Sequence, residues 1–407
     1  MENIEVPEYF ICPISLQIMK DPVTAITGIT YDRESIEHWL FKNHNTICPV
    51  TKQPLPTDSD LTPNHTLRRL IQAWYIANGA NGIDRIITPK PPASKLYVLN
   101  LVLDLSVPRS KIRALEKLEL LAKENERNRQ YMVEGGVRNA LVSFFIQCYR
   151  KCDINGLDKA LTTLSLIWNI SSCETMVENH EEIVDPIMWA LGLDHEMQNH
   201  AVIKNHAMCV LRSVIGKANS GTLERLRPEF FKKMIGFLRE SCVITQKGLD
   251  AALQVMLDTS SLSRNRNMMI ESRAVFELIE LELKFSNKKT TELVLGILFH
   301  LCSCADGRAQ LLSHAAGIAM ITKRILKVTP TADVRAMSIL SLISRYSATS
   351  GVLQEMLKVK TVSKLCTVLQ ADCPSHLKDK AREILRTHFD VWKNSPCVEV
   401  ATLTKYV

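Results

Sequence analysis

One helical pattern recurs seven times between Ala114 and His388. Six copies begin with alanine and one with Val294, and successive copies start 42 to 47 residues apart. A period of this length indicates stacked helical units, none of which can bury its apolar face without a neighbour. We therefore predict a helical solenoid from Arg109 onward. Each copy carries an apolar residue four positions after its start: Leu118, Leu164, Leu211, Val255, Leu298, Leu340 and Leu385.

The first two units are the most distinctive. RALEKLELLAKENERNRQYMVEGGVRNALVSFF resembles a whole armadillo repeat, with Gly135-Gly136 at the turn into its last helix. LSLIWNISSCETMVENHEEIVDPIMWAL resembles the next one. The later units diverge, so a HEAT-like or hybrid solenoid stays open as an alternative. Either form predicts a concave groove for an extended partner.

The composition favours a mostly helical protein with more than one unit. A chain of 407 residues is too long for one ordinary core, and 46% apolar, 23% charged and 6% aromatic residues argue against disorder or an all-β fold. No apolar run approaches the roughly 18 residues of a membrane span, and MENIEVPEYF lacks a signal-peptide pattern. Twelve scattered cysteines are expected to be reduced, which predicts a cytoplasmic or nuclear location.

The net charge of +7 lies beyond Asn78, because the first part of the chain has more acids than bases. Solvated helix faces explain this excess better than an acidic partner or a lipid surface does. We expect no nucleic-acid partner.

The first 78 residues predict a small mixed region. DPVTAITGITY indicates a hairpin that turns at Thr27-Gly28. DRESIEHWLFK has helical spacing with Asp32 as a candidate N-cap, and PNHTLRRLIQAW predicts a second helix. NGANGIDRIITPKPPASK then has linker composition. The expected fold is mainly α, a small α+β domain before an α-solenoid, with these boundaries: domain 5–79, linker 80–108, six to seven repeats over 109–395, and a tail 396–407.

Two Cys-Pro pairs, at Cys12 and Cys48, raise the question of a zinc site. Structural zinc takes four Cys or His ligands, usually from close spacings such as C-x-x-C. Here only His38, His44 and His65 accompany the two cysteines, and no C-x-x-C occurs in this region. We predict neither a metal nor a cofactor.

Six motifs in a fixed order carry a resemblance: CPIS from Cys12, MKDPV, TGITYDR, IEHWL, CPVT from Cys48, and LTPNHTLRRLI. Together they resemble the U-box, a zinc-free relative of the RING domain found in ubiquitin ligases. A U-box before armadillo repeats resembles the plant U-box E3 ubiquitin-protein ligases. GIDRIITPKPP resembles the linker of a subgroup tied to immune and drought signalling.

A zinc-free domain of this size needs other cross-links. Structural zinc supplies on the order of 10 kcal/mol in small domains, and charge-assisted hydrogen bonds between the loops are the natural replacement. The residues expected to form this polar network are Asp21, Asp32, Arg33, Gln53, Asn64 and Arg68, with Lys52 beside them.

The resemblance implies a shallow groove that docks a ubiquitin-charged conjugating enzyme (E2). Ile14 and Leu16 after the first Cys-Pro, Trp39 on the helix, and Pro49 and Val50 at the second are the matching positions. Apolar side chains on short turns are poorly placed to fill a small core, whereas a transient docking site needs a few such anchors. Core packing stays open as the alternative for each, and it is the favoured one for Leu16 and Val50.

Lys52 follows CPVT, where RING and U-box ligases usually carry an arginine that contacts both E2 and ubiquitin. Lysine keeps the positive charge but lacks the planar guanidinium group, which can donate two hydrogen bonds at once. The alternative that Lys52 is a surface lysine without this linchpin role therefore stays open. Cys12 and Cys48 fit buried turns, and we expect no covalent ubiquitin-enzyme intermediate. The rate gain should come from holding the thioester beside a substrate lysine.

The resemblance therefore predicts an E3 ubiquitin ligase whose armadillo groove binds the protein substrate. It also implies self-ubiquitination, homo- or hetero-oligomers, and a role in stress or immune signalling. One alternative is a non-catalytic armadillo adaptor with an inactive U-box. A nuclear-import receptor would need tryptophan and asparagine recurring along the groove, and only Trp168-Asn169 offers this pair.

Overall fold

The computed structural model of the chain describes residues 6–42, 45–56, 60–78, 93–170, 180–193, 199–240, 244–285 and 287–393. Internal contacts divide the chain into two units, Met1–Pro92 and Ala93–Val407. The expected tail, 396–407, and the first part of the expected linker, 80–92, lie outside the described residues.

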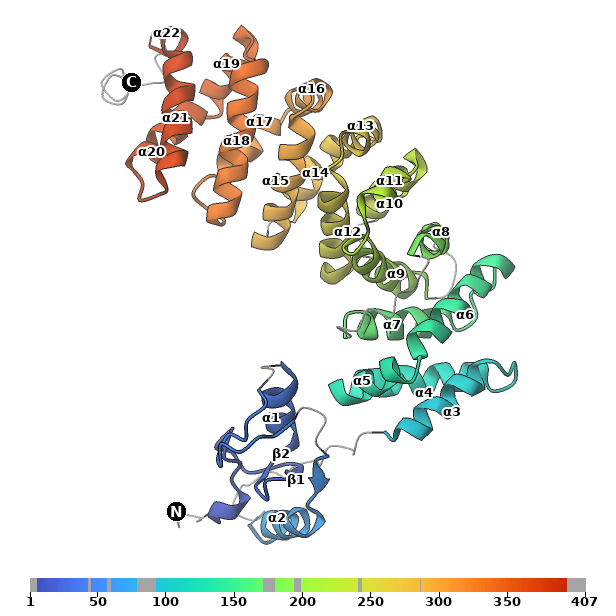
Figure 1. The fold of residues 1–407 in the computed structure, drawn as a ribbon. Coiled ribbons are helices and arrows are strands. Elements are labelled where there is room, and N and C mark those ends of the chain that lie inside the picture. Colours follow the sequence, from blue (N-terminus) through green and yellow to red (C-terminus); the bar gives the residue numbers. More distant parts are fainter. Residues whose placement is uncertain are drawn as a thin grey trace. The chain divides into compact units, whose positions relative to one another are not determined.

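The smaller unit is built around a three-stranded antiparallel sheet (Figure 1). β1 (Pro22–Thr24) lies in the centre, between β2 (Thr30–Asp32) and β3 (Thr62–Pro63). The β1–β2 hairpin turns at Gly28, whose φ is +78°. Glycine has no Cβ and adopts this conformation without strain, so the predicted turn is confirmed. The helical elements are η1 (Glu8–Phe10), α1 (Arg33–Glu37), the π-helical turn η2 (His38–Lys42) and α2 (His65–Asn78).

The core of the smaller unit draws one or two side chains from nearly every element. Cys12 and Cys48 belong to it and are both 0% exposed, which is typical of free cysteines used as small hydrophobes. The buried members are Phe10, Cys12, Met19, Val23, Ala25, Tyr31, Ile36, Leu40, Cys48, Leu55, Leu61, Ile71 and Tyr75.

The larger unit is a stack of helices. Their bounds are α3 (Lys95–Leu105), α4 (Lys111–Glu124), α5 (Glu126–Glu134), α6 (Val137–Lys151), α7 (Leu157–Ile167), α8 (His180–Leu191), α9 (His200–Ile215), α10 (Ser220–Glu224), α11 (Pro228–Arg239), α12 (Gln246–Thr259), α13 (Ser263–Glu271), α14 (Ala274–Lys284), α15 (Lys288–Cys302), α16 (Ala305–Ser313), α17 (Gly317–Arg324), α18 (Pro330–Tyr346), α19 (Ser350–Lys358), α20 (Thr361–Gln370), α21 (Ser375–Thr387) and α22 (Phe389–Trp392).

The seven recurring segments fall on α4, α7, α9, α12, α15, α18 and α21, and each of these helices packs against the next. This helix row, as we call it, follows the inner side of the curved stack in Figure 1, whereas α13, α16 and α19 lie on the outer side. The apolar residue four positions into each segment is 0% exposed in all seven copies. The solenoid is therefore confirmed, with one continuous apolar core.

The later repeats keep the three-helix form of the early ones. In the first repeat α5 joins α6 through Gly136 at a φ of +75°. The same turn joins α13 to α14 through Arg273 at 64°, and α19 to α20 through Lys360 at 61°. The divergence of the later sequences thus leaves the armadillo geometry in place. No helix among the described residues is long and apolar enough to cross a membrane.

The expected linker, 80–108, is wrong in its second half, because α3 packs on α4. Val98 is 0% exposed and Leu101 2% exposed in that contact. Ser94 caps the helix by accepting a hydrogen bond from the Tyr97 amide at 3.2 Å. Burial against the first repeat stabilises a helix that local composition did not indicate.

Candidate functional site

Two loops of the smaller unit share one backbone conformation, loop 1 (Cys12–Gln17) and loop 2 (Cys48–Gln53). In each loop the amide of the first residue donates to the carbonyl of the sixth over 2.8 Å. The amide of the fifth residue donates to the carbonyl of the first, over 2.9 Å in loop 1 and 3.0 Å in loop 2. The fifth residues, Leu16 and Lys52, have φ angles of 55° and 60°.

This left-handed conformation turns the fifth side chain away from the core. Leu16 is 76% exposed, and Val50 in loop 2 is 48% exposed. Core packing, the favoured alternative for these two residues, is therefore wrong. Ile14 holds the same loop position as Val50 and is half-buried against the core.

Trp39 ties the helical segment to loop 2. Its Nε1 donates to the Ile47 carbonyl at 2.9 Å, while the ring is half-buried against the core. Pro49 is half-buried on the loop that follows, and Ile47 is 50% exposed. Ile47 is an apolar surface residue that the sequence analysis missed, although its place directly before the second Cys-Pro was a signal.

Lys52 is exposed on loop 2. Its Nζ donates to the Pro49 carbonyl of the same loop at 2.9 Å. This cation therefore lies over loop 2 and does not cross-link the two loops.

The polar network is centred on Asp21, which is 2% exposed. Its Oδ2 lies 2.7 Å from Arg33 Nε on α1, and its Oδ1 pairs with Arg68 on α2. One buried carboxylate thus joins both helices to the start of the sheet through charge-assisted hydrogen bonds.

Asp32 and Asn64 take separate places in this network. Asp32 stands at the N-cap position of α1, but its carboxylate accepts hydrogen bonds from the amides of Lys20 and Asp21, at 2.7 and 2.8 Å. Burial raises the pKa of Asp32, while the bond from the Lys20 amide and the charges of Lys20 and Arg33 oppose the rise. Asn64 Oδ1 caps α2 by accepting from the Leu67 amide at 3.0 Å.

Gln53 does not belong to the network, and its prediction is wrong. Its side chain is exposed, and it contributes through its main-chain carbonyl, which closes loop 2.

The candidate metal ligands lie apart. Cys12 and Cys48 are buried, His38 and His65 are exposed, and His44 lies outside the described residues. Within the described part of the chain, no three His, Cys, Asp or Glu side chains come close enough to hold a metal ion.

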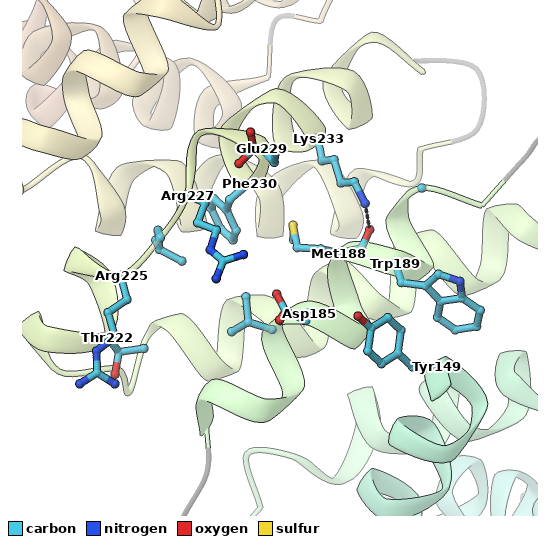
Figure 2. A pocket seen from close by; sticks show the side chains of 13 residues that line it. Tyr149, Asp185, Met188, Trp189, Thr222, Arg225, Arg227, Glu229, Phe230 and Lys233 are labelled. Atoms are coloured by element: carbon cyan, nitrogen blue, oxygen red, sulfur yellow. Dashed lines mark hydrogen bonds between the residues drawn. The ribbon is translucent and has the colours of Figure 1, made fainter. Parts of the chain in front are cut away.

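The solenoid carries a pocket of about 740 Å³ between α6, α8, α10 and α11 (Figure 2). Figure 2 shows the Arg227 guanidinium reaching between Phe230 and Asp185. Lys233 Nζ crosses from α11 to the Met188 carbonyl on α8 at 2.8 Å. The lining of the pocket combines apolar side chains with charged groups of both signs. None of its four helices belongs to the helix row.

Polar contacts join neighbouring helices of the helix row. Ser165 Oγ lies 2.8 Å from His206 Nδ1, and Asn205 Oδ1 accepts from the Thr245 amide at 2.8 Å. Burial lowers the pKa of His206, and the nearby Lys247 lowers it further. These groups stabilise the stack itself, because Asn205 is buried, His206 is half-buried, and both are bonded to a neighbouring helix or its cap.

Comparison with known proteins places both units in one family. The family model of the plant U-box protein ARM repeat region matches residues 98–407, and that of the U-box domain matches 6–80. E3 ubiquitin-protein ligase PUB24 of Arabidopsis thaliana is 42% identical, covering 99% of this chain and 96% of its own. PUB23 from the same plant, also named an E3 ubiquitin-protein ligase, is 38% identical over 100% of this chain and 98% of its own.

Solved structures support the solenoid fold. One from a study of the interaction between cadherin and beta-catenin aligns with a TM-score of 0.60 at 12% identity, over 80% of this chain and 58% of that one. An engineered protein aligns with a TM-score of 0.50 at 13% identity, over 77% of this chain and 88% of that one.

Proposed function

Because this chain belongs to the plant U-box protein family and is a U-box-type E3 ubiquitin transferase, we propose that loop 1, loop 2 and Trp39 dock a ubiquitin-charged E2. The solenoid holds the protein substrate. Ubiquitin then passes directly from the E2 thioester to a substrate lysine.

The exposure of Leu16 and Val50 is the observation that carries this proposal. Both side chains stand on loops whose backbone is fixed by internal hydrogen bonds, and both face solvent. Rigid apolar anchors of this kind suit a small interface that forms and dissociates in each catalytic cycle.

Direct transfer suits the buried state of the two loop cysteines. Cys12 and Cys48 are 0% exposed, so neither sulfur can reach a thioester without unfolding its loop. Catalysis then comes from orientation, which makes the attack of the lysine effectively intramolecular. Lys52 supplies an exposed cation on loop 2, where it contacts both E2 and ubiquitin.

The helix row supplies the substrate surface in this proposal. This row lies on the inner side of the curved stack, a surface that suits an extended peptide segment. The resemblance of the segment after the U-box extends the proposal to a stress or immune pathway.

Reconstituted self-ubiquitination tests the proposal. The full chain is mixed with ubiquitin-activating enzyme, ubiquitin, ATP and a panel of E2 enzymes. Leu16→Ala and Val50→Ala should each slow chain formation about tenfold, as expected for loss of one anchor worth more than 1 kcal/mol. The matched control is Ile76→Ala on α2, where the side chain is 71% exposed but lies on neither loop.

A zinc-selective chelator added to half of each reaction should change nothing, because excess Mg²⁺ is kept for the ATP that the activating enzyme uses. Loss of activity with chelator would overturn the zinc-free mechanism. If the wild-type protein forms no polyubiquitin with any E2, the docking proposal fails and an adaptor role replaces it. If Ile76→Ala slows the reaction as much as Leu16→Ala does, the docking surface has been misplaced.

A further inference from the structure

Three hydrogen-bond donors converge on the buried sulfur of Cys48. The Tyr31 hydroxyl lies 3.0 Å from Sγ, and Thr27 Oγ1 and the Thr51 amide each lie at 3.4 Å. They come from β2, from the hairpin turn and from loop 2 itself. The sulfur is 0% exposed, so these protein groups form its surroundings in place of water.

Burial raises the pKa of Tyr31, so the phenol keeps its proton and can donate it to the sulfur. The sulfur is then the acceptor for all three groups. A neutral thiol would have to point its own proton toward three other hydrogen-bond donors. A thiolate has no proton and can accept a hydrogen bond from each of the three donors.

We propose that Cys48 is held as a thiolate that positions loop 2. The sulfur anchors the Thr51 amide directly, and its contact with Tyr31 ties loop 2 to β2. The consequence for docking rests on the proposed function, whereas the ionisation state of Cys48 does not.

Titration behaviour agrees with this geometry. Burial raises the pKa of Cys48, but the bonds from Thr27, Thr51 and Tyr31 lower it more, from 9.0 to about 6. At Cys148 no hydrogen-bond donor opposes burial, which is the main cause that raises the pKa to about 11. The three donors thus distinguish Cys48 from a buried cysteine of this ordinary kind.

Other titratable groups near the sulfur leave the donor pattern intact. Burial raises the pKa of Tyr31, so the phenol keeps its proton. Cys12 on loop 1 acts on the same phenol and raises its pKa slightly further. Lys52 is the cation on loop 2, and its amine is bonded to the Pro49 carbonyl.

The pH dependence has a definite sign. Because the pKa of Cys48 falls from 9.0 to about 6 on folding, the thiolate stabilises the folded loop fully above pH 9.0. That contribution is lost as the pH falls through 6. Protonation removes the acceptor of the Thr51 amide, so loop 2 loosens and docking weakens in acid.

Thiolate ultraviolet absorbance of the full chain tests the ionisation state. The difference between wild type and Cys48→Ser should titrate with a midpoint near pH 6. Tyr31→Phe removes one donor without removing the ring, and should shift the midpoint upward. Cys152→Ser, at an exposed cysteine of the solenoid, is the control and should leave the difference unchanged. Absence of thiolate absorbance from Cys48 at neutral pH overturns the proposal.

Amide NMR resonances and E2 binding test the positioning role. In wild type the Val50 and Thr51 resonances should shift with the same midpoint, and in Cys48→Ser they should not. Cys48→Ser should bind E2 about tenfold more weakly at neutral pH, as expected for loss of a charge-assisted hydrogen bond. Cys48→Asp restores an anion and should recover most of the binding.

The outcomes separate the two proposals. Equal E2 binding by wild type and Cys48→Ser at every pH overturns the positioning role. A Cys48→Asp variant that folds but binds as weakly as Cys48→Ser also overturns it. If no E2 binds the wild type while its Val50 and Thr51 resonances titrate as expected, the docking proposal alone fails.

Discussion

Single buried polar groups hold the smaller unit together where a zinc-binding relative of this shape would use metal. Asp21 is the clearest case, because its two oxygens serve Arg33 and Arg68 on separate helices. The two arginines compensate the charge of this buried carboxylate, and its removal leaves their charges in a poorly solvated place.

Asp21→Asn should therefore destabilise the smaller unit by about 3 kcal/mol, the lower end for breaking a buried ion pair. Hydrogen exchange of the β1 and β2 amides in the full chain measures this loss directly. Asp60→Asn makes the same substitution at an exposed carboxylate, and should change stability by less than about 0.5 kcal/mol. Equal exchange rates in the two variants would contradict a structural role for Asp21.

Residue types predicted part of this network, and the backbone decided the rest. Asp21, Arg33 and Arg68 followed from the need to replace zinc, because charged groups in small loops require partners. Asp32 was expected to cap α1, but the amides of Lys20 and Asp21 compete for its carboxylate and win. That competition depends on tertiary placement.

The positive φ of Leu16 and Lys52 is a further point that propensity could not supply. Neither residue type favours this conformation. A signal was nevertheless present, because CPISLQ and CPVTKQ share cysteine, proline, a hydroxyl residue and glutamine at equal spacing. Comparing the two segments would have predicted equal loops, and hence the outward direction of Leu16.

The helical elements of the solenoid show how one turn tolerates different residues. Between α5 and α6 the left-handed position is Gly136, whereas between α19 and α20 it is Lys360. The left-handed conformation costs an L-residue about 1–2 kcal/mol, and glycine avoids this cost at an entropic loss of about 0.5–1 kcal/mol.

Lys360→Gly should consequently stabilise the solenoid by about 0.5–1 kcal/mol, the difference between these two effects. Thermal unfolding followed by circular dichroism measures the gain. Gln354→Gly, six residues earlier and in the middle of α19, is the control and should cost about 1 kcal/mol. If both glycine variants lower the midpoint equally, strain at Lys360 is refuted.

α3 shows why the beginning of the solenoid was hard to predict. Its buried residues, Val98, Leu101 and Leu105, have helical spacing, but Leu96, Leu99 and Leu103 on the other face are apolar too. Because both faces of α3 are apolar, its sequence does not show the alternation of apolar and polar residues that marks a helix. The prolines just upstream also favoured the interpretation of this segment as a linker. The seven inner helices lacked this ambiguity, so their positions followed from the sequence alone.

The division into two units separates the two tasks of the proposed function. Contacts divide at Pro92–Ala93, and each unit has its own core cluster. In the proposed function the smaller unit delivers ubiquitin and the solenoid presents its target. Neither task requires that the two units share a core, but transfer of ubiquitin requires that the two units be joined in one chain.

Separation of the units should keep the chemistry and abolish delivery. Residues 1–92 alone should discharge ubiquitin-loaded E2 to free lysine at the rate of the full chain, because the docking loops lie within this unit. The lysines of 93–407 should be modified in the full chain but far more slowly when the two pieces are mixed. A covalent link holds its partners at an effective concentration on the order of millimolar, so pieces mixed at micromolar concentration should react on the order of a thousandfold more slowly. Mass spectrometry of the solenoid lysines measures the difference, and equal modification in the mixed and the linked samples would show that the linkage does not direct transfer.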